Sequence, residues 1–167
     1  QWLDRVFTDQ PNDVYGFLVA LSSIIHHEFT YSRREARGTQ TALTTVERRS
    51  GTCRDFAFLF MECARLFGFA ARFVTGYLHV RDDDEEAGFT GGGSTHAWAD
   101  IYVPGEGWLE FDPTNLIDDN QALIRIAVTR TPLQATPISG TYARDEGQFL
   151  DMEVTVDVRA VPETEEP

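Results

Sequence analysis

The sequence predicts an α+β fold in which one apolar helix packs on an antiparallel β-sheet. Residues 53–67 carry apolar side chains at spacings of three and four, the period of a helix with a buried face. Residues 95–103 and 108–112 alternate instead, and the turn sequence PGEG separates them, which is typical of a β-hairpin. With 167 residues, 42% of them hydrophobic, the chain is long enough for one domain with one core.

The first element expected along the chain is an amphipathic helix from Asp13 to about Phe29. A turn sequence ending at Asp13 precedes it, and apolar residues follow the helical period: Val14, Phe17, Leu18, Leu21, Ile24 and Ile25. The adjacent His26 and His27 face different sides of this helix. Because zinc ligands on one helix prefer a spacing of four, we expect no metal site there.

A surface connection and a short helix are expected to lead into the apolar helix. Residues 31–40 are polar and arginine-rich, and residues 41–49 have room for one or two helical turns. Thr52 is then the expected N-cap, and Asp55, three residues on, completes a capping box. Gly68 supplies the left-handed stop.

Strands are expected on both sides of the hairpin. Residues 69–80 are β-branched and aromatic, residues 122–129 alternate, and residues 150–160 form a longer amphipathic alternation. Between the first of these and the hairpin lie the acidic run 82–86 and a glycine-rich stretch, which predict a mobile loop.

The charge of the chain narrows its expected partners. There are 27 acidic against 14 basic residues and a formal net charge of -13, which repels phosphate backbones and anionic lipid. We therefore expect no nucleic-acid partner and no membrane insertion. No phosphate-binding loop or metal-ligand spacing occurs, so we expect neither cofactor nor metal. The oligomeric state has no signature in the sequence.

The two cysteines, Cys53 and Cys63, both belong to the predicted apolar helix. Ten residues of helix separate them by roughly 15 Å, whereas a disulfide needs Cα atoms within about 7 Å, so they cannot pair with each other. Free thiols suit a reducing compartment and predict a cytoplasmic location. The start at Gln1 instead of methionine indicates a piece of a longer protein.

Cys53 is the candidate nucleophile because it is the first residue of that helix. The positive end of the helix dipole favours a thiolate there. The alternative is that Cys53 is a small apolar residue of the core. The hairpin favours the first interpretation, since it carries His96 near the start of one strand and Asp112 near the end of the next. A third group that orients an imidazole is what nucleophilic catalysis by cysteine requires.

The register of the hairpin decides whether His96 and Asp112 can meet. Directly opposite residues of an antiparallel pair point to the same face. Pairing Val103 with Gly107 around a three-residue loop brings both side chains to one face, whereas pairing Val103 with Trp108 separates them unless a bulge restores the phase.

Three motifs, in this order, resemble those of the bacterial transglutaminase-like proteins, a branch of the papain-like cysteine enzymes: GTCRDFA at 51–57, THAWAD at 95–100 and GWLEFDPTN at 107–115. The resemblance implies a transglutaminase-like catalytic core over residues 1–120, a strand-rich C-terminal part of the same domain over 121–161, and an acidic tail over 162–167. It also implies that Cys53 is the nucleophile, His96 the general base and then acid, and Asp112 the orienting group.

The resemblance leaves the side-chain donor of the oxyanion hole open. Papain-like proteases keep a glutamine six residues before the cysteine, where this chain has Glu47; Gln40 is the candidate in its place. Asp100 also stands where many family members have glutamate. Trp98 and Trp108 either wall a substrate groove or pack the hairpin.

The expected activity is that of a cysteine-dependent amide hydrolase or acyl transferase acting on a peptide or protein amide through a thioester. Water as the second nucleophile gives a peptidase or amidase, and an amine gives a transamidase. The acidic run 82–86 is expected to favour cationic side chains or amine acceptors. The alternative is a non-catalytic peptide-binding module that keeps the fold.

Overall fold

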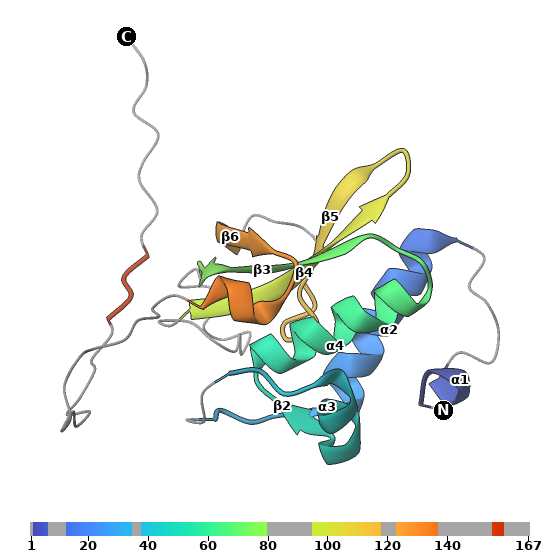
Figure 1. Cartoon of the computed structure of the whole chain (residues 1–167), viewed down its shortest axis with the longest axis horizontal. Coiled ribbons are helices and arrows are strands. Elements are labelled where there is room, and N and C mark those ends of the chain that lie inside the picture. The colour runs from blue at the N-terminus through green and yellow to red at the C-terminus, as the bar shows by residue number, and fades with distance from the viewer. Residues whose placement is uncertain are drawn as a thin grey trace, which may run out of the picture.

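A layer of helices covers one face of a four-stranded antiparallel sheet (Figure 1). The computed structural model describes residues 2–6, 13–34, 38–79, 95–117, 123–136 and 155–158. The acidic run 82–86, predicted to be a mobile loop, lies outside these residues.

The helices begin and end close to where their caps were predicted. Asp13 caps the second helix, Thr41 the third and Thr52 the fourth, and Gly68 adopts the predicted left-handed conformation with φ of 88°. The first helix has five residues, too few to show a period. No helix of the described part has the length and apolar character that crossing a membrane requires. The helices are α1 (Trp2–Val6), α2 (Val14–Glu28), α3 (Ala42–Arg48) and α4 (Cys53–Leu66).

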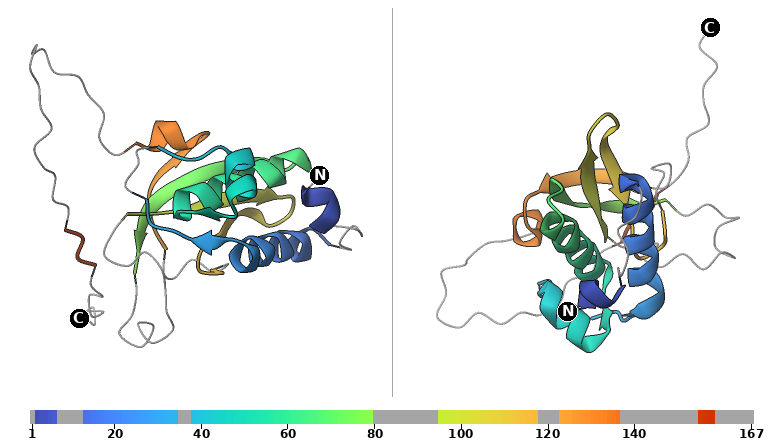
Figure 2. Two further views of the ribbon diagram at one scale, coloured as in Figure 1. Left: turned by 90° about the horizontal axis from the view of Figure 1, so that it is seen from below. Right: turned by 90° about the vertical axis from the view of Figure 1, so that its right-hand side faces the viewer.

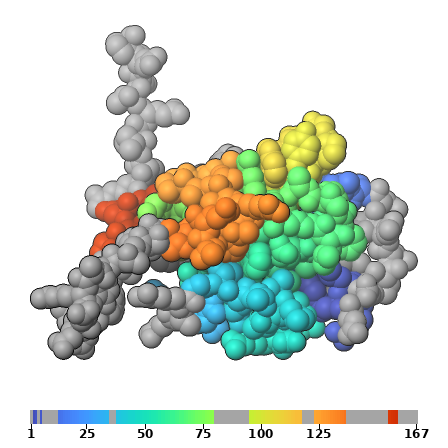
Figure 3. Space-filling view, viewed as in Figure 1, coloured from blue at the N-terminus to red at the C-terminus, as the bar shows by residue number. Residues whose placement is uncertain are grey.

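The main sheet has the strand order β5-β4-β3-β6, and every neighbouring pair is antiparallel. Val103 pairs with Gly107, so the predicted three-residue loop is confirmed. Figure 3 shows this β4–β5 hairpin projecting from the body of the molecule in yellow. A short 3-10 helix, η3 (Pro132–Ala135), follows the last strand. The strands are β3 (Ala71–Leu78), β4 (Thr95–Val103), β5 (Gly107–Phe111) and β6 (Leu123–Thr129).

The long strand predicted over residues 150–160 is not found where the structure can test it. Residues 155–158 are its described part, and they form no strand. They pair with none of the described strands, so their alternation of exposed and half-buried side chains is not accompanied by a hydrogen-bonded ladder.

A second, very small sheet corrects the prediction of a surface connection after α2. β1 (Thr30–Tyr31) pairs in parallel with β2 (Ser50–Gly51), directly before α4. Ser32 N–H extends the pairing by donating to the Gly51 carbonyl at 2.8 Å. Strands of two residues show no alternation, so the sequence pattern could not reveal them.

The core lies between α4 and the sheet, as the predicted alternation of β4 requires. Ala97, Ala99 and Ile101 are fully buried on the face that α4 covers, together with Phe56 and Phe60 of α4. Figure 2 shows α2 beside α4 on the same side of the sheet. Small side chains on β4 let the helix approach the sheet closely.

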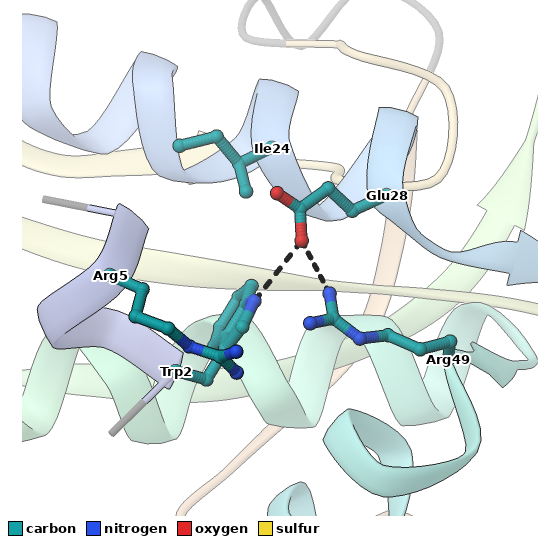
Figure 4. Close-up of a pocket in the computed structure, with 5 residues that line it drawn as sticks. All are labelled: Trp2, Arg5, Ile24, Glu28 and Arg49. Carbon is teal, nitrogen blue, oxygen red and sulfur yellow. Dashed lines mark hydrogen bonds and ion pairs between the residues drawn. The ribbon is translucent and has the colours of Figure 1, made fainter.

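A polar contact anchors α1 to this body. The Trp2 indole N–H donates to the Glu28 carboxylate at 3.1 Å, and Arg49 pairs with the same carboxylate while its guanidinium lies 5.7 Å from the centroid of the Trp2 ring. Figure 4 shows this cluster, which lines a pocket together with Arg5 and Ile24. None of the three candidate catalytic residues lines that pocket.

Gly76 marks a place where two strands come unusually close. The register between β3 and β6 shifts between Thr75 and Gly76, and a Cβ added at Gly76 would lie 1.9 Å from the carbonyl oxygen of Ile124. Backbone atoms cannot yield as a flexible side chain does, so only glycine fits this bulge.

We expect Gly76→Ala to lower the free energy of unfolding by about 3 kcal/mol, because the added methyl overpacks the sheet. Gly68→Ala is the matched control, since no atom lies within 4 Å of its added Cβ. It should cost only the left-handed backbone penalty of about 1 kcal/mol. Urea unfolding of the two variants measures both values, and equal losses would contradict the close approach.

Candidate active site

Cys53 lies at the first turn of α4, where the sequence placed it. Thr52 is the N-cap with extended backbone angles, so the Cys53 N–H is one of the first helical N–H groups and has no carbonyl partner within the helix. The side chain of Cys53 is buried, with 7% of the residue exposed. A thiol and a backbone donor therefore share the positive end of a buried helix.

Asp55 organises the turn that precedes the thiol. Its fully buried carboxylate accepts hydrogen bonds from the Thr52 N–H at 2.9 Å and from the Gln40 N–H at 2.6 Å, and it pairs with Arg34 at 3.0 Å. The Thr52 bond is the predicted carboxylate half of a capping box. The bonds from Gln40 and Arg34 could not be predicted, because these partners are 15 and 21 residues away in the chain. Gly51 leaves room for this carboxylate, since an added Cβ there would lie 2.8 Å from Asp55 Cβ.

Gln40 has a different role from the one expected for it. Its side-chain amide donates to the Ser50 carbonyl at 3.0 Å and to Asp55 Oδ2 at 3.2 Å, and its Oε1 accepts from Arg48 at 3.0 Å. Both amide hydrogens are thus engaged in holding the chain before α4. The expectation that Gln40 is an oxyanion donor is therefore wrong for this structure, and Glu47 is exposed on α3.

His96 and Asp112 meet as the hairpin register predicted. His96 Nε2 lies 2.7 Å from Asp112 Oδ2, and both side chains are buried. Because Nε2 is engaged with Asp112, Nδ1 is the nitrogen left for the Cys53 thiol. Nδ1 is buried and has no partner of ordinary hydrogen-bond geometry in the described part of the chain. Such contacts are often long before substrate binds and shorten in the complex.

The positive charge of His96 and the negative charge of Asp112 stabilise each other. Burial acts to lower the pKa of His96, but the charge of Asp112 and its hydrogen bond, with further contributions from Cys53, raise that pKa to about 10. Burial likewise acts to raise the pKa of Asp112, and the charge and hydrogen bond of His96 hold it below its usual range. At neutral pH the pair is therefore imidazolium and carboxylate.

The turn after β5 fixes the Asp112 carboxylate. The Thr114 N–H donates to Oδ1 at 2.8 Å and the Asn115 side-chain amide donates to Oδ2 at 2.9 Å. His26 of α2 donates from Nδ1 to the Thr114 carbonyl at 2.9 Å and so ties the turn to the helical layer. No sequence pattern pointed to His26, because its partner is 88 residues further along.

Trp98 and Trp108 pack the hairpin, which was one of the two interpretations of the sequence. Trp98 is fully buried, stacks on His96 with ring centroids 6.3 Å apart, and donates to Glu110 at 3.2 Å. Trp108 is 40% exposed, and the Arg72 guanidinium lies 4.0 Å from the centroid of its ring. These contacts do not place either tryptophan on a groove that opens from Cys53.

Cys63 differs sharply from Cys53. It lies in the body of α4 with 3% of the residue exposed, and burial, followed by the charge of Glu62, raises its pKa to about 12. Both cysteines are free, as the spacing along the helix predicted. Cys63 is therefore a protonated core residue at neutral pH.

Known sequences match most of this chain. The model of the transglutaminase-like superfamily matches residues 2–113. An uncharacterized protein of Mycobacterium tuberculosis is 35% identical over 147 residues, which cover 81% of this chain and 45% of that protein. An uncharacterized protein of Mycobacterium leprae is 32% identical over 116 residues, covering 70% of this chain and 40% of that protein. The chain thus spans less than half the length of these curated relatives.

Solved structures share the fold. A Cytophaga hutchinsonii protein described as a candidate cysteine protease matches with a TM-score of 0.66 and 27% identity, covering 80% of this chain and 42% of that chain. A structure described as a TGase matches with a TM-score of 0.50 and 16% identity, covering 74% and 31%. At that identity the second likeness concerns the fold alone. The predicted α+β, transglutaminase-like fold is confirmed.

We expect Asp112→Asn to lower the free energy of unfolding by about 2 kcal/mol at pH 7, because it removes a charged hydrogen bond from a buried ring. The pKa of His96 in the folded chain lies above its unfolded value of 6.5. The stabilisation is therefore complete below pH 6.5 and is lost as the pH rises through about 10. Urea unfolding at pH 7 and pH 10 should show wild type and variant converging at the higher pH. A difference that stays constant would contradict an imidazolium–carboxylate pair.

Proposed function

Because the chain belongs to the transglutaminase-like superfamily, we propose that it is a cysteine-dependent enzyme that hydrolyses amide bonds or transfers their acyl groups. The observation that carries the proposal is the buried His96–Asp112 pair, whose free Nδ1 is left for a thiol at the start of α4. In this proposal α4 provides the nucleophile, and the β4–β5 hairpin with the turn after it provides the base and the orienting group.

Acylation uses the thiolate and the imidazolium together. Cys53 Sγ adds to the carbonyl carbon of the substrate amide, and the carbonyl electron pair moves onto oxygen. The Cys53 N–H is the backbone donor available to that oxyanion. When the carbonyl re-forms, the carbon–nitrogen bond breaks and His96 gives its Nδ1 proton to the leaving amine. The products are a thioester on Cys53 and a free amine.

Deacylation reverses the proton movement. Neutral His96 accepts a proton at Nδ1 from water or from a second amine as that nucleophile adds to the thioester. Collapse of the second oxyanion expels the Cys53 thiolate and releases an acid or a new amide. Asp112 keeps the ring orientation throughout, because its bond to Nε2 fixes which nitrogen faces sulfur.

The likeness to a candidate cysteine protease supports hydrolysis of a peptide or protein amide as the first activity to test. Transfer to an amine uses the same thioester, so it is the second. The net charge of -13 supports a preference for cationic substrates or amine acceptors. Two free cysteines support a reducing compartment such as the cytoplasm.

The alternative proposal is a peptide-binding module that keeps the fold without turnover. It predicts binding that does not depend on the thiol. The enzyme proposal instead predicts covalent chemistry at Cys53, so the thiol itself separates the two.

In native protein, we expect iodoacetamide to label Cys53 and to leave Cys63 unlabelled, because Cys63 is buried and its pKa is about 12. Peptide mass spectrometry after short exposure at graded pH measures both sites. Denatured protein is the control, since both thiols should then react. Equal labelling of the two residues in the native state would contradict the assignment of Cys53 as the reactive thiol.

Cys53→Ala should reduce hydrolysis of a peptide amide by about a thousand-fold or more, because it removes the nucleophile. Cys63→Ala is the matched control and should keep turnover. Adding a primary amine and measuring the acid and amide products by mass spectrometry gives the ratio of hydrolysis to transfer. Binding that persists in Cys53→Ala, with no turnover in wild type, would favour the peptide-binding module.

A further inference from the structure

The site leaves one chemical role unfilled, that of a side-chain donor for the oxyanion. Three donors around the candidate site are already engaged: the Gln40 amide, the Thr52 hydroxyl on Asp55 at 3.1 Å, and the Trp98 indole on Glu110. Arg54 is the next residue along α4, and adjacent residues of a helix do not face each other. A neighbouring element offers a further donor.

Tyr31 of β1 lies beside the start of α4. Its Cα is paired with that of Gly51, two residues before Cys53, and the backbone pairing continues through Ser32. Its ring packs edge-on against Phe56, three residues after Cys53, with centroids 6.4 Å apart. Tyr31 therefore contacts residues that come both before and after Cys53 in the chain: its backbone pairs with Gly51, and its ring packs on Phe56 in the first turn of α4.

The Tyr31 hydroxyl is free to donate. The residue is half-buried, and in the described part of the chain no hydrogen bond uses its hydroxyl. Burial and then the charge of Cys53 raise the pKa of Tyr31; the charges of Arg33 and Arg54 oppose this shift, and the smaller effect of Asp112 adds to it. The phenol therefore stays protonated at neutral pH, and the charges of Cys53 and Asp112 both act on it.

We infer that Tyr31 is a catalytic residue whose hydroxyl donates a hydrogen bond to the oxyanion formed on the substrate carbonyl, alongside the Cys53 N–H. The inference rests on the proposed function and adds the residue that stabilises its transition state. Tyr31 gives up no proton in the step. It holds the negative oxygen while the carbon–sulfur bond forms and while the leaving group departs.

Two reactions of Cys53 separate this role from a structural one. Alkylation by iodoacetamide displaces iodide at a saturated carbon and forms no oxyanion. Acylation by p-nitrophenyl acetate adds sulfur to a carbonyl, forms an oxyanion and expels p-nitrophenolate, which absorbs visible light. Tyr31→Phe should therefore slow acylation by about a hundred-fold and leave the alkylation rate within about two-fold of wild type.

Tyr102→Phe is the matched control, because it removes a hydroxyl from a tyrosine that is 43% exposed on the β4–β5 hairpin. It should change neither rate. Unchanged alkylation in Tyr31→Phe also reports that the variant is folded around an intact thiol.

Equal acylation rates in wild type and Tyr31→Phe would overturn the inference and leave the proposed function standing. An equal loss of both rates would also overturn it, since Tyr31 would then act on the thiol itself. If wild-type protein is alkylated at Cys53 but never acylated, the proposed function fails, and the inference fails with it.

Discussion

The buried pair of His96 and Asp112 is the interaction on which the rest of the site depends. Taking two charges out of water costs several kcal/mol per ion, and the structure offsets that cost with a 2.7 Å bond and two further donors to the carboxylate. The bond between His96 and Asp112 requires the hairpin to be in one register, because only then do the two side chains lie on the same face. The loop from Val103 to Gly107 supplies that register, so a turn far from the chemistry decides whether the imidazole has a partner.

Much of this arrangement follows from local pattern. The caps Asp13 and Thr52, the stop at Gly68 and the alternation along β4 set the main helices and the hairpin, because each rests on residues within one turn or one strand. Opposite residues of an antiparallel pair point to the same face, so the register of the hairpin then brings His96 to Asp112. These features could be read from the sequence because their causes are close together in the chain.

Long-range polar contacts could not be read in the same way. Asp55 satisfied a local rule as a capping residue, but its partners Arg34 and Gln40 come from a segment that looked like a plain surface connection. The β1–β2 pair is too short to produce a period, so the position of Tyr31 beside Gly51 was also hidden. The sequence shows that a side chain can form hydrogen bonds, but only the fold determines which buried group it bonds to.

The far face of the sheet ties the hairpin to the edge strand. Arg125 of β6 pairs with Glu110, and its guanidinium lies 3.4 Å from Asp100, which Arg72 also binds at 2.8 Å. Burial acts to raise the pKa of Asp100, and the two arginines oppose that effect. Because Glu110 lies two residues before Asp112, β6 helps to hold the strand that leads to the Asp112 carboxylate. Residues 123–129 thus belong to the same sheet as the β4–β5 hairpin that carries His96.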